Sequence, residues 1–173
     1  SQTAALEAGG ESFAVLGSGV DVCYPRNNRE LYRKLELQGG ILSEYPPGTQ
    51  PLAHHFPIRN RIISGLSQAV LVIEARERSG SLITADCALE QGRDVMAVPG
   101  RITDPVSAGC NRLIAQGAGI ILSAEYLLEL LRISPCGVKN TKINQIPLET
   151  KEKLVYSCLD LQPVSLEELI LRT

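Results

Sequence analysis

Short apolar runs alternate with longer amphipathic stretches along most of this chain. The apolar runs span four to seven residues, as in buried strands, and the intervening stretches of about ten residues place apolar positions at helical spacing. We predict strands at 12–17, 41–45, 69–75, 94–98 and 119–122. We predict helices at 2–8, 27–38, 58–67, 81–91, 107–116 and 124–132, with Gly9-Gly10 and Gly39-Gly40 ending the first two.

Buried strands that alternate with helices are typical of a parallel sheet covered on both faces. The sequence therefore predicts an α/β fold, an extended Rossmann-like core at residues 1–132 with one mostly parallel sheet and helices on both faces. Residues 133–150 mix Pro, Gly, Asn and Thr without a sustained period, which indicates a linker. Residues 151–173 predict two helices separated by Pro163, the second capped by Ser165 and Glu168. We interpret them as the start of a truncated module and expect the chain to be a fragment at both ends.

Composition indicates an ordinary globular protein, since 44% of the 173 residues are hydrophobic and 21% are charged. The formal net charge of -2 argues mildly against nucleic-acid binding, but residues 54–101 carry six Lys or Arg against five Asp or Glu. The five cysteines form no C-x-x-C pair and have no histidine at zinc-ligand spacing, which favours a reduced, cytoplasmic protein without a metal site. The apolar runs are too short to cross a bilayer, so we expect no membrane insertion.

Arg59 and Arg61 lie near the start of a predicted helix, after Phe56 and a proline-stiffened loop. Guanidinium groups make two-point contacts with phosphate oxygens, and an aromatic ring beside them can stack on a nucleobase. The alternative is structural: Phe56 packs the loop on the core, and the two arginines pair with Glu44 and Glu74. Spacing alone does not choose between these two roles.

A second candidate site lies between the strand predicted at 69–75 and the following helix. In an open parallel sheet ligands bind at this edge, where the first-turn amides and the helix dipole attract anions. We expect Gly80 to let a ligand approach the backbone closely. The alternative is an ordinary helix N-cap with a few surface arginines. The candidate residues are Arg76, Arg78, Ser79, Gly80, Ser81 and Thr84.

The loop after the strand predicted at 94–98 repeats this arrangement, with Gly109 and Asn111 at the start of the next helix. Carboxyl ends of parallel strands meet at one edge of a sheet. We therefore expect the arginines and the helix-start amides of these loops to converge along one rim, as a cradle for unpaired polynucleotide.

Motifs of common nucleotide-dependent enzymes are missing from the sequence. GSGVD at 17–21 is similar to a dinucleotide-binding loop but lacks the third glycine, and no G-x-x-x-x-G-K-[ST] run occurs. The sequence therefore predicts no cofactor, and we identify no catalytic residues.

Five blocks of the chain resemble the DNA-processing protein A family, also called Smf, in order, spacing and residue identity. The resemblance runs from Ala4 to about Leu131 through AVLGSGVDVCYPRNNREL, ILSEYPPGTQP, FPIRNRIISGLS, SGSLITADCALEQGRDVMAVPG and SAGCNRLIAQGA. It implies a core that binds single-stranded DNA in a basic pocket, usually as a homodimer, and that protects incoming DNA and loads RecA recombinase in natural transformation. It also implies that residues 151–173 begin a winged-helix-like module. The family's F-P-x-R-N-R block corresponds to Phe56, Arg59, Asn60 and Arg61, and its S-G-S-L-I-T block to residues 79–84.

Two departures from the family pattern imply a reduced DNA affinity. The family's earlier G-S-R loop does not occur in this sequence, and a position that is often basic is Ala53. Two other functions stay open as alternatives. A phosphoribohydrolase-like, nucleotide-binding enzyme would carry a P-G-G-x-G-T loop, but Pro99-Gly100 is followed by Arg101-Ile102-Thr103, which argues against hydrolysis. A pure interaction platform would dimerise and contact RecA without binding DNA.

Overall fold

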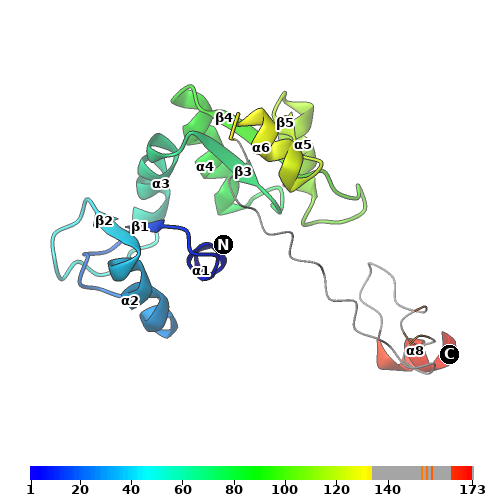
Figure 1. Cartoon of the computed structure of the whole chain (residues 1–173), viewed down its shortest axis with the longest axis horizontal. Helices are drawn as coiled ribbons and strands as arrows, with labels where there is room; N and C mark the ends of the chain where they lie inside the picture. The colour runs from blue at the N-terminus through cyan, green and yellow to red at the C-terminus, as the bar shows by residue number, and fades with distance from the viewer. Residues whose placement is uncertain (134–152, 154, 156, 158–164, 173) are drawn as a thin grey trace. The chain divides into compact units, whose positions relative to one another are not determined.

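The computed structural model describes residues 1–133, 153, 155, 157 and 165–172. Contacts divide the chain into two compact units, Ser1–Ser134 and Pro135–Thr173. The first unit is a mixed α/β fold with parallel strands, as the sequence predicts (Figure 1). Of the helices that are described, none has both the length and the apolar character that a membrane crossing requires.

In the second unit the structure describes helix α8 (Leu166–Arg172). The hydroxyl oxygen of Ser165 accepts a hydrogen bond from the Glu168 amide at 3.2 Å, which confirms the predicted N-cap. The break at Pro163 and the predicted linker beyond residue 133 lie outside the described residues. The winged-helix-like module stays a prediction.

A β-α-β arrangement of two parallel strands opens the first unit. Its elements are α1 (Gln2–Glu7), β1 (Ser12–Leu16), the 3-10 turn η1 (Arg26–Asn28), α2 (Arg29–Leu37) and β2 (Gly39–Ser43). The register of β1 and β2 runs from Ser12 opposite Gly39 to Leu16 opposite Ser43. Helix α2 packs on this pair and buries Leu35, which is one of the inner-face positions that its apolar spacing predicts.

A second group of parallel strands follows, in the order β3-β4-β5. Its elements are α3 (His55–Leu66), β3 (Ala69–Val72), α4 (Gly80–Glu90), β4 (Asp94–Ala97), α5 (Ala108–Ala115), β5 (Gly119–Ile120) and α6 (Ala124–Leu130). The core lies between this sheet and its helices. Ala85, Ala88, Ala97 and Cys110 in this core are all fully buried. Because these side chains are small, α4 and α5 can approach the strands closely.

The strands form two parallel sheets, not the single sheet that the sequence predicts. Among the described residues β1 pairs only with β2, and β3 pairs with β4 on one side alone. Helix α3 links the two groups, because it contacts both β1 and α4. The prediction was wrong on this point because an apolar run shows that a segment is a strand but not which strand lies beside it.

The second helix ends directly before Gly39-Gly40, as predicted, but neither glycine takes the left-handed conformation of a helix stop. Helix α2 ends at Leu37 with Gln38 as its C-cap, and Gly39 is the first residue of β2. A Cβ atom on Gly39 would lie 1.8 Å from the carbonyl oxygen of Ser12 in β1. Glycine is therefore needed here so that the two backbones can approach. In contrast, Gly9 does follow α1 in the left-handed conformation, with φ at 81°.

Candidate nucleic-acid interface

Helix α3 carries four of the predicted site residues and begins earlier than predicted. Its first residue is His55, three residues before the expected start, so Phe56 and Pro57 lie in its first turn. Proline is tolerated there because first-turn amides have no acceptor within the helix. Arg59 and Arg61 therefore lie in the second turn, and the expectation that they accompany the helix-start amides is wrong for α3.

The ring of Phe56 lies against a second aromatic ring and a guanidinium group. Its centroid is 5.9 Å from that of Tyr24 at an interplanar angle of 46°, and the guanidinium carbon of Arg59 lies 5.5 Å from it. Tyr24 is 56% exposed, whereas Phe56 is half-buried. An accessible aromatic pair beside a guanidinium group offers a stacking surface to a nucleobase.

Tyr24 is a further candidate site residue, which is not among those predicted from the sequence. The residue lies in the loop after β1, 32 positions before Phe56, and only the tertiary fold brings the two rings together. A usable signal was its rarity, since the chain has five tyrosines and two phenylalanines and no tryptophan. Tyr24 could have been proposed as a stacking residue on this ground, because it is an aromatic residue directly before a proline, in a loop at the carboxyl end of a strand.

Arg59 is held by two acceptors. Its Nε donates to Asn60 Oδ1 at 3.1 Å, and its Nη1 donates to the carbonyl oxygen of Val15 in β1. Burial lowers the pKa of Arg59, but an arginine keeps its charge in proteins. A guanidinium group has five N–H donors, so those not bonded to Asn60 and Val15 can still meet a phosphate. Asn60 itself is buried and orients Arg59.

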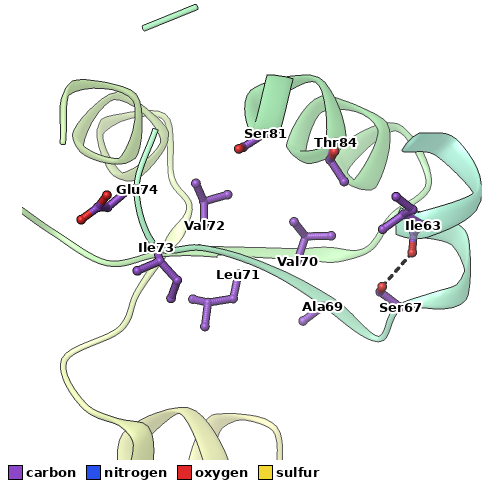
Figure 2. A pocket seen from close by; sticks show the side chains of 10 residues that line it. All are labelled: Ile63, Ser67, Ala69, Val70, Leu71, Val72, Ile73, Glu74, Ser81 and Thr84. Carbon is purple, nitrogen blue, oxygen red and sulfur yellow. Dashed lines mark hydrogen bonds between the residues drawn. The ribbon is translucent and has the colours of Figure 1, made fainter. Parts of the chain in front are cut away.

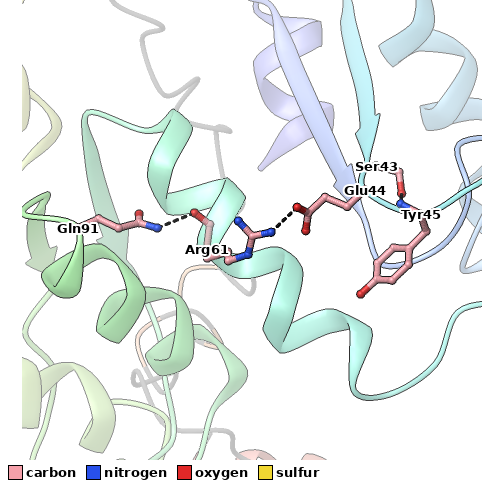
Figure 3. Close-up of polar contacts among 5 residues, drawn as sticks. All are labelled: Ser43, Glu44, Tyr45, Arg61 and Gln91. Atoms are coloured by element: carbon pink, nitrogen blue, oxygen red, sulfur yellow. Dashed lines mark hydrogen bonds and ion pairs between the residues drawn. The ribbon is translucent and has the colours of Figure 1, made fainter.

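Arg61 forms an ion pair with Glu44, which directly follows β2 (Figure 3). The structural alternative predicts a pairing with Glu44 and a pairing with Glu74. The pairing with Glu44 forms, whereas Arg59 bonds to Val15 and Asn60 and not to Glu74. Both side chains of the pair are accessible, at 53% and 41%. Exposed ion pairs contribute at most about 1 kcal/mol, so a phosphate can replace the carboxylate of Glu44 at little cost.

The residues of the predicted second site lie at the start of α4, which has the N-cap that the structural alternative also predicts. Ser79 is the N-cap, and its hydroxyl oxygen accepts a hydrogen bond from the Ser81 amide at 3.3 Å. Ser81 is exposed and Thr84 half-buried, and both line a cavity of about 560 Å³ along the free edge of β3 (Figure 2). A Cβ atom on Gly80 would meet nothing within 4 Å, so packing within the protein does not require glycine there.

Arg76 and Arg78 are exposed in the loop that leads into α4, as predicted. The carbonyl oxygen of Arg76 accepts a hydrogen bond from the Ser79 amide at 3.1 Å, which fixes this loop against the helix start. We call Arg76, Arg78, Ser79, Gly80, Ser81 and Thr84 the helix-start cluster. We call Tyr24, Phe56, Arg59 and Arg61 the aromatic cluster.

Gly109 and Asn111 make contacts that hold the loops together. The Gly109 amide donates to the carbonyl oxygen of Ala75 at 2.8 Å. Asn111 bonds to both backbone groups of Gly100, accepting from its amide at 3.1 Å and donating to its carbonyl oxygen at 3.0 Å. Gly109 therefore holds the loop that leads into the helix-start cluster, and Asn111 holds the loop after β4 at Gly100.

The two clusters do not converge on one rim, contrary to the prediction from the sequence. The carbonyl oxygen of Arg61 accepts a hydrogen bond from Gln91 at 2.8 Å, and Gln91 caps the carboxyl end of α4 (Figure 3). Ser79 lies at the amino end of the same helix, whose 11 residues span about 16 Å at 1.5 Å each. The prediction failed because order along the chain does not show which end of α4 faces α3.

Two cavities, one beside each cluster, share lining residues. One has a volume of about 720 Å³ and is lined by Tyr24 and Arg59, and the other is the cavity beside Ser81. Both cavities are lined by Ile63 of α3 and by Ser67, the C-cap of that helix. The candidate interface is therefore a surface with two neighbouring parts, one aromatic and one at a helix start.

Comparison with known proteins places the chain in a family. The sequence model of DNA recombination-mediator protein A matches residues 1–132. The DNA processing protein DprA of Streptococcus pneumoniae is 52% identical over 125 residues, which are 72% of this chain and 44% of the relative. The protein Smf of Escherichia coli is 55% identical over 130 residues, which are 75% of this chain and 35% of the relative.

Solved structures show the same similarity. The X-ray structure of DNA processing protein A from S. pneumoniae matches with a TM-score of 0.68 at 50% identity, covering 74% of this chain and 45% of that one. A structure of DNA processing protein A from Helicobacter pylori, described for its single-stranded DNA binding mode, matches with a TM-score of 0.64 at 28% identity, over 69% of this chain and 55% of that one. This chain thus spans less than half the length of the S. pneumoniae and E. coli relatives. On the match over residues 1–132, it belongs to the DNA recombination-mediator protein A family, whose members include DprA and Smf.

Proposed function

We propose that this chain binds single-stranded DNA and does so without catalysing a reaction on it. The observation that carries the proposal is the Tyr24–Phe56 ring pair with Arg59 beside it. Aromatic rings that stack on bases next to cationic groups are the usual means of binding unpaired polynucleotide without sequence preference. The single-stranded DNA binding of the H. pylori relative supports the same ligand.

In this proposal the aromatic cluster stacks on bases and the helix-start cluster binds the backbone phosphates. The amino end of α4 carries the positive end of its dipole, and Arg76 and Arg78 are exposed beside it. Arg61 exchanges its ion pair with Glu44 for a phosphate. Gly109 and Asn111 act by holding the loops in place.

We further propose the cellular role that family membership suggests. In the cytoplasm, homodimers of the whole protein would protect incoming DNA and load RecA recombinase during natural transformation. The name of the S. pneumoniae relative, DNA processing protein DprA, supports a role in DNA processing. Co-sedimentation of the whole protein with RecA on single-stranded DNA tests the loading step.

Replacing Tyr24 with alanine tests the DNA-binding proposal directly. Stacking on one base contributes about 1–3 kcal/mol, so we expect Tyr24→Ala to weaken binding of a labelled dT oligomer by roughly tenfold in fluorescence anisotropy. Tyr126→Ala is the matched control, since Tyr126 is an exposed tyrosine on α6, outside both clusters. Equal affinities for Tyr24→Ala and the unmodified chain would refute the stacking role, and the interaction-platform alternative would then be preferred.

Replacing Gly80 with alanine tests whether a ligand approaches the backbone at the start of α4. The space around Gly80 accommodates a Cβ atom, so we expect the melting temperature to stay unchanged. Affinity for dT should fall by roughly 1 kcal/mol, about fivefold, if a phosphate bonds to this backbone. Gly65→Ala is the control, because Gly65 lies in α3 and its Cβ would make only ordinary contacts with Gln91. Unchanged affinity in Gly80→Ala would exclude a close backbone contact there.

A further inference from the structure

A third cavity, of about 540 Å³, opens beside the start of α2 and belongs to neither cluster. Three arginines line it: Arg26 in η1, and Arg29 and Arg33 in α2. Their spacing of three and four residues places all three guanidinium groups on one side of this short helical segment. The cavity is therefore a local concentration of positive charge in a chain whose net charge is negative.

The three arginine side chains are exposed, and none has an ion-pair or hydrogen-bond partner among the residues that the structure describes. Lys34, on the same helix, does have one, because it pairs with Glu30 at 3.3 Å. Like charges three or four residues apart destabilise a helix by a few tenths of a kcal/mol per pair. A bound anion would offset this repulsion.

The same cavity holds two carboxylates, Asp21 and Glu36, neither of which forms an ion pair with an arginine there, so its lining keeps an excess of one positive charge. Asp21 accepts hydrogen bonds from the Gly48 amide at 2.7 and 3.0 Å, so it holds the loop after β2. Glu36 lines the cavity near Arg33 but forms no ion pair with it among the described residues. The hydroxyl group of Tyr32 donates to the carbonyl oxygen of Val20, which fixes α2 against the loop after β1.

The position of the cavity indicates which anion it binds. Arg26 comes two residues after Tyr24 in the sequence, so the arginines of the cavity directly follow a residue of the aromatic cluster along the chain. The amino end of α2 adds the positive end of a helix dipole. We infer that Arg26, Arg29 and Arg33 form a phosphate-binding site that takes the backbone phosphates of a DNA strand next to the bases stacked on Tyr24. The choice of a polynucleotide as the source of the phosphates rests on the proposed function.

The salt dependence of DNA binding tests this site. For single strands, log K falls with log salt at about -0.7 per phosphate contact, so Arg29→Gln/Arg33→Gln should make the slope shallower by about 1.4. The control is Lys34→Gln/Arg132→Gln, which also removes two positive charges. Lys34 lies on α2, outside the lining of the cavity, and Arg132 lies just after α6. The salt slope of this control should equal that of the unmodified chain within error. Glutamine is a good helix former, so α2 should persist, and circular dichroism checks this.

The possible outcomes separate this inference from the proposed function. If Tyr24→Ala weakens dT binding but Arg29→Gln/Arg33→Gln leaves both affinity and slope unchanged, the phosphate site is refuted and the proposed function stands. If the unmodified chain binds no dT but binds pyrophosphate in calorimetry, and Arg29→Gln/Arg33→Gln abolishes that binding, the site serves a small phosphate ligand and DNA as its source is refuted. If neither dT nor pyrophosphate binds, both proposals are wrong.

Discussion

Replacing Arg59 with alanine is expected to lower the free energy of unfolding by about 3 kcal/mol as well as to weaken DNA binding. The substitution removes two charge-assisted hydrogen bonds, to Val15 in β1 and to Asn60. Such bonds contribute about 1.5–3 kcal/mol each, and the side chain of Asn60 is buried and would lose its partner. Urea denaturation followed by circular dichroism measures the loss.

Arg61→Ala is the matched control for this prediction. Arg61 lies two residues further along α3 and pairs with Glu44 near the surface, so its loss should cost at most about 1 kcal/mol of stability. We expect Arg61→Ala to weaken dT binding with folding intact. If both variants unfold at the same urea concentration, Arg59 does not brace β1 and its role is confined to the ligand.

These two arginines show why a double substitution would be hard to interpret. The F-P-x-R-N-R block reads as one binding motif, yet one of its arginines bonds to a strand and the other to a surface carboxylate. A loss of binding in Arg59→Ala/Arg61→Ala would combine misfolding with the loss of a phosphate contact. Arg61→Ala alone, together with Tyr24→Ala, measures binding without that ambiguity.

Local signals in the sequence were sufficient to predict the helices and strands of the first unit. The helix predicted at 81–91 corresponds to α4 (Gly80–Glu90), and the strand predicted at 94–98 corresponds to β4 (Asp94–Ala97). These features depend on residues close together in the chain, where helical periodicity and capping chemistry act. The start of α3 lies three residues before the predicted one, because the first turn of a helix accepts a proline such as Pro57.

The features that the sequence did not predict all depend on contacts between distant segments. Gly39 is needed for its approach to Ser12, 27 positions away, and not for a left-handed helix stop. Tyr24 becomes a site residue only through the ring of Phe56. The separation of the two clusters depends on which end of α4 packs beside α3, and no local pattern encodes that orientation.

Substituting alanine for Gly109 should have the largest effect on stability of any change considered for the interface. The new Cβ atom would lie 2.7 Å from the carbonyl oxygen of Ala75, 2.8 Å from that of Arg76 and 2.9 Å from the Cβ of Ala75. Overpacking against flexible side chains costs about 1–3 kcal/mol, and here the neighbours include backbone that cannot rotate away. We expect a loss of at least about 3 kcal/mol, or roughly 6–12 °C in melting temperature.

The same substitution should also weaken DNA binding, because the displaced backbone at Arg76 leads directly into Ser79 and the start of α4. Gly80→Ala separates the two effects, since it adds a methyl group to the helix-start cluster itself, at a position where no atom lies within 4 Å. Gly109→Ala should therefore change both melting temperature and affinity, whereas Gly80→Ala should change affinity alone. If Gly109→Ala lost affinity at an unchanged melting temperature, Gly109 would contact the DNA itself and its assignment as a support for the loops would be wrong.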